Sequence, residues 1–173
     1  MTQNETERED APARKGRRQA AKEIGEAAEA REAQGVAEAA KTGALDQARI
    51  VTALRAAGDK KAVEPVVLDL RELASFTDYF VIASGTNARQ VQAIADEIVE
   101  RLKDEGTRPE RVEGHRTAEW VLIDYGDFLV HVFEAKARRF YDLERLWREA
   151  ARVELPAELA GEPAAGGEAE RGA

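Results

Sequence analysis

Most of the structural information in this chain lies in residues 111–147, RVEGHRTAEWVLIDYGDFLVHVFEAKARRFYDLERLW. This stretch contains two apolar runs, residues 120–124 and 128–133, on either side of the short link 125–127. Both runs are rich in Val, Ile, Leu and aromatic residues, which favour strands, and the glycine in the link indicates a tight hairpin. Neither run alternates between apolar and polar residues. We therefore expect the hairpin to lie inside a sheet with helices packed on it.

A helical pattern follows the second apolar run. Apolar residues then recur at three- and four-residue steps, as on one face of a helix, namely Phe140, Leu143, Leu146, Trp147 and Ala150. We expect Lys136, Arg138 and Arg139 on the first turn of this helix, where the helix dipole disfavours cations. These charges are interpreted either as contacts to a partner or as a solvated basic turn.

Four further elements are predicted upstream. The sequence indicates a helix over residues 44–58, strands over residues 65–70 and 77–84, and a helix that ends at Gly106. Asn87 is suited to cap this second helix, with Gln90 three residues on as in a capping box. Its buried face is marked by apolar side chains at helical spacing, which are Val91, Ile94, Ala95, Ile98 and Leu102. A short strand over residues 110–113 follows.

The order of these elements predicts a compact α/β (α+β) domain over residues 44–153, a mixed β-sheet with flanking helices. The strands on either side of the 87–106 helix are expected to be parallel and the hairpin antiparallel. Residues 1–43 are rich in Ala, Glu and Arg, which indicates a disordered or weakly helical tail. Its basic cluster at 14–18 could contact RNA, but a solvated charge run explains it better. Residues 154–173 are expected to form a disordered acidic tail.

Composition narrows the classes of function. The chain has 173 residues, a net charge of −8 and no cysteine. An acidic chain lacks the basic field of a general nucleic-acid binder, and no sequence-specific nucleic-acid binding is expected. The missing cysteines exclude disulfides and fit a reducing compartment. No apolar run approaches the ~20 residues of a membrane helix, and the start lacks a secretory signal. We expect a cytoplasmic protein.

Three features of the sequence are candidates for an anion-binding, metal-binding or catalytic site, and none of them is specific enough to predict one. Residues 84–87 join a strand to a capped helix and could bind an anion, but a plain turn and cap explain them better. The two histidines, His115 and His131, lack metal-motif spacing, which favours a structural or interface role. The strand-end aspartates include no D-x-D pair for two metal ions, and these are Asp69, Asp78, Asp124 and Asp127. No metal, cofactor or catalytic residue is expected.

The aromatic residues are more informative. Tyr, Trp and Arg dominate protein–protein hot spots, and they gather here in one part of the predicted domain. Core packing is the best explanation for Phe140 and Trp147. It explains the basic and aromatic sequence of residues 138–141 less well. We therefore expect a protein-binding surface that includes this segment.

Taken together, these segments resemble the ribosomal silencing factor family, also called Iojap or RsfS, over about residues 45–150. The order and spacing of the segments carry the resemblance. They are residues 59–62 (DKKA), 68–70 (LDL), 76–82 (FTDYFVI), 84–86 (SGT), 112–114 (VEG), 118–120 (AEW), 124–127 (DYGD), 130–133 (VHVF) and 139–147 (RFYDLERLW).

The resemblance implies a nucleotidyltransferase-like core that lacks the catalytic carboxylate pair, and a protein that is not an enzyme. It implies binding to the large ribosomal subunit through its protein L-fourteen, at the face where the small subunit docks. Subunit association would then be blocked and translation repressed when nutrients are scarce or in stationary phase. A homodimer is implied for the free protein.

Six residues of the matching motifs are expected to bind the partner. Trp120 is the leading anchor, with Asp124 and Tyr125 nearby at the hairpin tip. Arg138, Arg139 and Tyr141 are expected to supply polar and charge-assisted contacts. One alternative is a nucleotidyltransferase-like, nucleotide-binding enzyme that uses residues 84–86 and the strand-end aspartates. Another is a generic dimerisation module.

Overall fold

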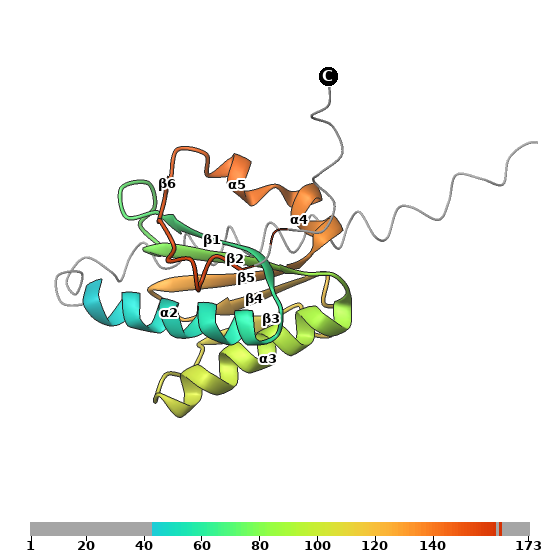
Figure 1. Cartoon of the computed structure of the whole chain (residues 1–173). Coiled ribbons are helices and arrows are strands. Elements are labelled where there is room, and N and C mark those ends of the chain that lie inside the picture. Colours follow the sequence, from blue (N-terminus) through green and yellow to red (C-terminus); the bar gives the residue numbers. More distant parts are fainter. Residues whose placement is uncertain (1–42, 162, 164–173) are drawn as a thin grey trace, which may run out of the picture. The chain divides into compact units, whose positions relative to one another are not determined.

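The structure is a computed structural model that describes residues 43–161 and residue 163 (Figure 1). Most of the tail predicted over residues 1–43, including its basic cluster, lies outside the described residues. The elements, in chain order, are α2 (Gly43–Asp59), β1 (Val63–Asp69), β2 (Tyr79–Gly85), α3 (Ala88–Asp104), β3 (Arg111–Glu113), β4 (Trp120–Asp124), β5 (Phe128–Glu134), α4 (Ala135–Tyr141), α5 (Leu143–Leu146) and β6 (Ala151–Arg152).

The strands form one six-stranded mixed sheet in the order β3-β4-β5-β2-β1-β6. β2 and β5 are parallel, and every other neighbouring pair is antiparallel. The predicted mixed sheet with flanking helices is therefore confirmed, as is the β4–β5 hairpin. The strands on either side of α3, β2 and β3, run parallel as predicted, but they are not neighbours, because the hairpin lies between them in the sheet.

Helices α2 and α3 cover one face of the sheet (Figure 1). All five residues of the predicted apolar stripe on α3 are buried in the core. Burying each aliphatic side chain contributes about 1.5–3 kcal/mol, so this stripe is a large part of what holds α3 to the sheet. The helix ends before Gly106, whose φ of +86° is readily adopted only by glycine.

The predicted cap of α3 is confirmed with a small change. The Oδ1 atom of Asn87 accepts a hydrogen bond from the backbone N–H of Gln90 at 2.9 Å. The Oε1 atom of Gln90 accepts from the backbone N–H of Thr86 at 2.7 Å, one residue earlier than in a standard capping box. Side chains of the chain itself therefore satisfy backbone donors at the start of α3.

Helices α4 and α5 lie on the opposite face of the sheet (Figure 1). The prediction of one continuous helix here is wrong, because Asp142 adopts a left-handed conformation, with φ of +46°, that separates α4 from α5. Phe140 and Leu146, which the helical pattern assigned to a buried face, are 69% and 72% exposed. The pattern failed because the chain changes direction halfway along it.

The break also reverses the argument about the helix dipole. Arg138 and Arg139 lie in the last turn of α4 instead of the first turn of a longer helix. Cations near the C-terminus of a helix are stabilised by its dipole. The inference that these arginines carry a local cost for the sake of a partner is therefore wrong.

The two ends of the domain differ from prediction in smaller ways. β1 begins before the proline, and Pro65 lies in an irregularity of the β1–β2 pairing, where a missing N–H is tolerated. At the other end, the backbone N–H of Val153 bonds to the carbonyl of Val67 at 2.9 Å. Leu159 is buried in the helix-covered core. The boundary predicted at residue 153 is therefore too early.

Candidate functional site

The six predicted partner-binding residues lie in two separate places. Trp120 begins β4 and pairs in register with Phe133, near the end of β5. Because α4 starts directly after β5, Trp120 lies beside Tyr141 at the end of α4, the helix that also carries Arg138 and Arg139. The hairpin tip is at the far end of β4, about 13 Å away for four residues of extended strand.

Trp120 is half-buried within a cluster of aromatic rings. Its ring stacks on Phe133, with centroids 5.0 Å apart, and lies 4.7 Å from the ring of Tyr141. Its indole N–H donates a hydrogen bond to Nδ1 of His131 at 3.1 Å. The packing and this bond fix the orientation of the indole.

His131 is only 1% exposed, and its ring lies 4.5 Å from that of Phe80. Burial disfavours the charged form and lowers the pKa of His131 to about 3. The imidazole is therefore neutral at physiological pH. Since Nδ1 accepts the bond from Trp120, Nε2 carries the proton, and within the described part of the chain this buried nitrogen has no hydrogen-bond partner. This geometry agrees with the interpretation of His131 as a structural histidine.

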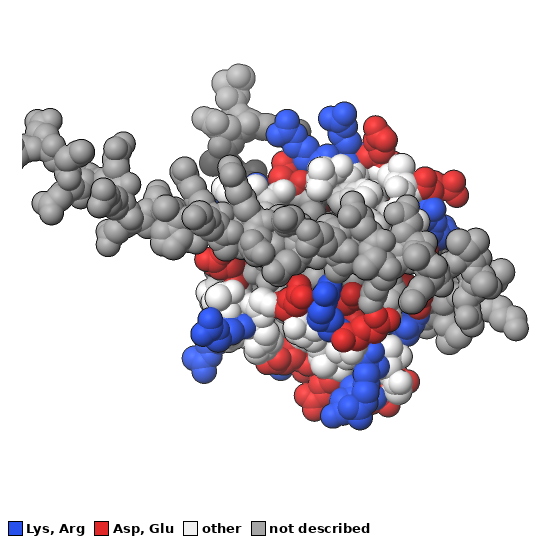
Figure 2. All heavy atoms as spheres, turned by 180° about the vertical axis from the view of Figure 1, so that it is seen from behind, with Lys and Arg blue, Asp and Glu red and all other residues white. Residues whose placement is uncertain are grey.

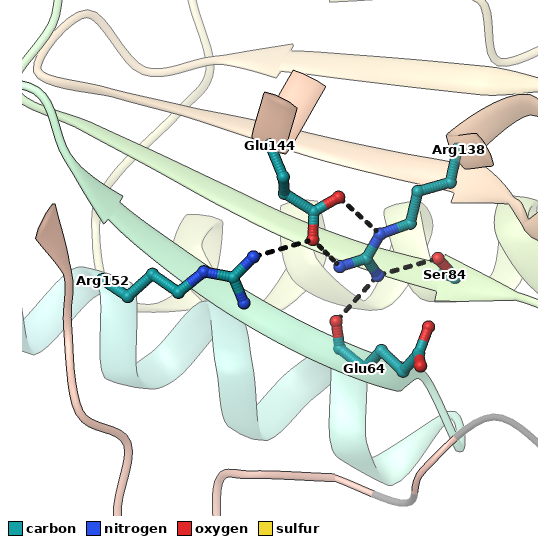
Figure 3. Close-up of polar contacts among 5 residues, drawn as sticks. All are labelled: Glu64, Ser84, Arg138, Glu144 and Arg152. Carbon is teal, nitrogen blue, oxygen red and sulfur yellow. Dashed lines mark hydrogen bonds and ion pairs between the residues drawn. The ribbon is translucent and has the colours of Figure 1, made fainter. Parts of the chain in front are cut away.

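Arg138 is not a surface residue, which corrects the expectation from sequence. It is 8% exposed, and its guanidinium points inward between the sheet and α5 (Figure 3). Nη1 donates to Oγ of Ser84 at 2.9 Å and to the carbonyl of Glu64 at 2.7 Å. Nε and Nη2 donate to the carboxylate of Glu144 at 3.2 and 2.7 Å. All of these partners belong to the domain itself.

This network connects elements that are distant in sequence. Arg138 of α4 contacts β1 through Glu64, β2 through Ser84 and α5 through Glu144 (Figure 3). Arg152 of β6 lies 3.9 Å from the same Glu144 carboxylate. The network therefore holds the α4–α5 corner against the sheet and fixes the position of Tyr141 beside Trp120.

The Glu144 carboxylate should make the stability of the domain depend on pH. Hydrogen bonds from Arg138 lower the pKa of Glu144 below its ordinary value of 4.5. The unfolded chain then binds the proton more readily, so the contribution of Glu144 is complete above about pH 4.5 and is lost as pH falls through the lower folded-state pKa. Glu144→Gln should lower the urea midpoint at neutral pH and flatten its fall below pH 4.5. An unchanged acid limb in urea titrations would contradict this role.

The hairpin tip is also more buried than expected. Asp124 is buried, and its Oδ1 accepts a hydrogen bond from the backbone N–H of Gly126 at 2.8 Å, which shapes the turn. Tyr125 is buried in the helix-covered core, stacked 4.9 Å from Phe128, and burial raises the pKa of its hydroxyl. The expectation that these two side chains face the surface is wrong. That Asp124 and Tyr125 bind a partner stays a prediction, and their burial does not support it.

Arg139 and Tyr141 fit the expectation better. Arg139 is exposed and Tyr141 is half-buried against Trp120. Both line a hollow of about 810 Å³ on α4 and α5, together with Leu73, Phe140, Asp142, Arg145, Leu146, Trp147, Arg148 and Glu149. Exposed aromatic, aliphatic and arginine side chains are the composition of a protein-binding surface.

Charge on the surface is mixed. Figure 2 shows Lys and Arg side chains interspersed with Asp and Glu among the described residues of the face that it draws. A protein that tracks a phosphate backbone needs Lys and Arg clustered on one face. The mixed charges on this face do not form such a cluster, and they are typical of a solvated surface with individual ion pairs.

The residues of the alternative, nucleotide-binding interpretation are engaged in other contacts. The Ser84 hydroxyl accepts from Arg138, and Asp69 and Asp127 form ion pairs with Arg71 and Arg49 at 2.6 and 2.8 Å. Among residues 43–161, no three His, Asp or Glu side chains come together in a way that could hold a metal ion. No helix within this part of the chain has the length and apolar character needed to cross a membrane.

A glycine sets the path of the chain into Trp120. Gly114 has φ of +77°, and a Cβ there would clash with the carbonyl oxygen of Trp120. We predict that Gly114→Ala destabilises the domain by at least about 2 kcal/mol, because it adds left-handed strain to a backbone clash. Gly58→Ala is the matched control. Nothing lies near a Cβ at this position in α2, so alanine should be neutral or stabilising. Equal urea midpoints for the two variants would contradict the prediction.

Comparison with known proteins finds relatives whose names refer to the ribosome. A family model described as "Ribosomal silencing factor during starvation" matches residues 43–172. A protein of Halalkalibacterium halodurans named ribosomal silencing factor RsfS is 42% identical over 110 residues, which cover 64% of this chain and 94% of that protein. A mouse protein named "Mitochondrial assembly of ribosomal large subunit protein 1" is 35% identical over 75 residues, 42% of this chain and 33% of that one.

The fold is also similar to solved structures. A crystal structure of a Chromobacterium violaceum protein matches with a TM-score of 0.58 and 35% identity. The match covers 64% of this chain and 89% of that one. This solved structure therefore has a fold similar to that of this chain over most of its own length.

Proposed function

Since this chain belongs to the family of ribosomal silencing factors that act during starvation, we propose that it binds the large ribosomal subunit through protein L-fourteen and blocks association with the small subunit. The observation that carries the proposal is the family match over residues 43–172, which spans the whole described domain. The name of the mouse relative, which refers to assembly of the ribosomal large subunit, supports the choice of subunit.

The surface that we propose for this contact is formed by Trp120, Tyr141 and Arg139. Trp120 and Tyr141 are half-buried and pack on each other, while Arg139 is exposed and lines the same hollow as Tyr141. Anchors held in place before binding lose little conformational entropy on binding, which favours affinity. Asp124, Tyr125 and Arg138 would act indirectly, since each makes its contacts within the domain.

Steric competition is the proposed mechanism. The protein binds free large subunits and cannot bind subunits that are already joined, so it draws large subunits out of the joining equilibrium by mass action. No bond is made or broken in this scheme. Its strength depends on the concentration of the protein relative to its dissociation constant for the large subunit.

Three finer features complete the proposal. The core would be related to nucleotidyltransferases without sharing their chemistry. The protein would act in the cytoplasm, where its target is. The free protein would form a homodimer, since Leu146 and other exposed apolar side chains on α4 and α5 would be covered by a second copy. A dimer through this surface would have to dissociate before Tyr141 and Arg139 could contact the ribosome.

Cosedimentation with separated ribosomal subunits tests the proposal. The purified protein should migrate with the large subunit alone, and purified L-fourteen should compete for it. Migration with neither subunit would overturn the proposal. If the protein binds the large subunit and L-fourteen does not compete, the proposed subunit is right but the proposed contact with L-fourteen is wrong.

A further inference from the structure

The pair of Trp120 and His131 has a feature that stability alone does not explain. His131 is buried among rings, yet it has two polar nitrogens to satisfy. Nδ1 accepts the indole N–H of Trp120, but Nε2 has no partner among the described residues. A buried donor without a partner costs about 1–3 kcal/mol, which offsets what the bond to Trp120 contributes, so stability alone gives no reason for a histidine at this position.

What His131 provides is a hydrogen-bond acceptor at one place. Trp120 and His131 lie diagonally across the β4–β5 pair, because Trp120 is opposite Phe133 and His131 is opposite Leu122. Their side chains are within reach of each other on the same face of the sheet. The bond at 3.1 Å prevents the half-buried indole from turning its N–H towards water.

The bond also determines what Trp120 can offer to another molecule. An indole has one hydrogen-bond donor and no acceptor. In this domain the donor is already used by His131. The accessible part of the ring therefore presents only its apolar and π surface, which binds aliphatic side chains or cations and gives no hydrogen bond.

We propose that His131 is a positioning residue for partner binding, which fixes Trp120 so that its ring offers π surface, and no N–H, to the ribosomal partner. The group that meets Trp120 is then an aliphatic or cationic side chain. This inference rests on the proposed function for its binding partner, but the positioning of Trp120 can be measured without ribosomes.

Two substitutions of His131 separate positioning from packing. His131→Leu removes the unsatisfied Nε2–H but leaves the indole N–H of Trp120 without its acceptor, so the two effects offset each other and the urea midpoint should change little. Binding to isolated large subunits should nevertheless weaken about fivefold to tenfold, because the indole is no longer fixed. His131→Asn places an oxygen acceptor on the same Cγ branch, so it should recover binding even though the smaller side chain lowers stability.

A double-mutant cycle gives the sharper test. Trp120→Phe keeps an aromatic ring and has no N–H to hold. In this background His131→Leu should change large-subunit affinity by less than about twofold, since additivity fails only for residues that interact. An equal loss in both backgrounds would overturn the positioning role and assign the effect of His131 to the fold.

Indole fluorescence tests the same contact in the free protein. The chain has two tryptophans, so Trp147→Phe leaves Trp120 as the only indole, which is excited selectively at wavelengths that tyrosine does not absorb. Adding His131→Leu should shift its emission to longer wavelength and lower its anisotropy. Unchanged emission with unchanged affinity would overturn the inference. If the wild-type protein fails to bind large subunits, the proposed function fails, while a shifted emission would still support the positioning of Trp120.

Discussion

Trp120→Ala should weaken binding to the large ribosomal subunit by at least about thirtyfold, the effect of losing one central hot-spot residue. The residue combines a large ring with a fixed orientation, since it is stacked on Phe133 and packed against Tyr141. The measurement is the dissociation constant for isolated large subunits. Circular dichroism of the variant should remain that of a folded domain.

Val112→Ala is the matched control for this substitution. Val112 is an exposed apolar residue on β3, in register with Ile123, whose side chain belongs to the helix-covered core. It therefore lies on the other face of the sheet and should change affinity by less than about twofold. Unchanged binding of a folded Trp120→Ala variant would show that Trp120 is not the anchor.

Arg138→Ala should cost about 3 kcal/mol of folding free energy, because the partly buried Glu144 carboxylate loses its hydrogen-bonded cation and keeps only the more distant Arg152. The Ser84 hydroxyl and the Glu64 carbonyl also lose a donor. The effect should appear in urea unfolding as a large fall in midpoint. Affinity for the large subunit should fall as well, because Tyr141 is no longer held beside Trp120.

The neighbouring arginine on α4 is the matched control. Arg139 is exposed and has no ion pair among the described residues, so Arg139→Ala should change stability by no more than about 0.5 kcal/mol. A double variant, Arg138→Met with Glu144→Leu, should recover part of the loss by replacing the ion pair with apolar contacts. Similar midpoints for Arg138→Ala and Arg139→Ala would contradict the structural role of Arg138.

Elements with a strong local signal could be predicted from the sequence. The β4–β5 hairpin follows from two apolar runs around a short glycine link, and α3 follows from a capped, regularly spaced stripe. The break at Asp142 could not be predicted in this way, because its cause is tertiary. Arg138 and Glu144 are six residues apart. In a continuous helix such residues would not be neighbours, so their ion pair requires the turn at Asp142.

The candidate site was predicted less well for a related reason. Sequence alone does not distinguish Arg138 from Arg139, since both are basic residues in the same run, and only the fold turns one of them inward. The contact between Trp120 and His131 could have been predicted from the sequence of the hairpin. The register of a short hairpin places the two residues diagonally on one face, where an indole donor and an imidazole acceptor meet.

Sedimentation of ribosomes under joining conditions would decide whether this protein blocks subunit association. Separated subunits are mixed at joining magnesium concentrations while the protein is titrated in. The fraction of joined ribosomes should fall as the protein rises, with half-inhibition near its dissociation constant for the large subunit, and Trp120→Ala should lose the effect. If the protein binds large subunits and the joined fraction stays constant, the proposed silencing mechanism is wrong.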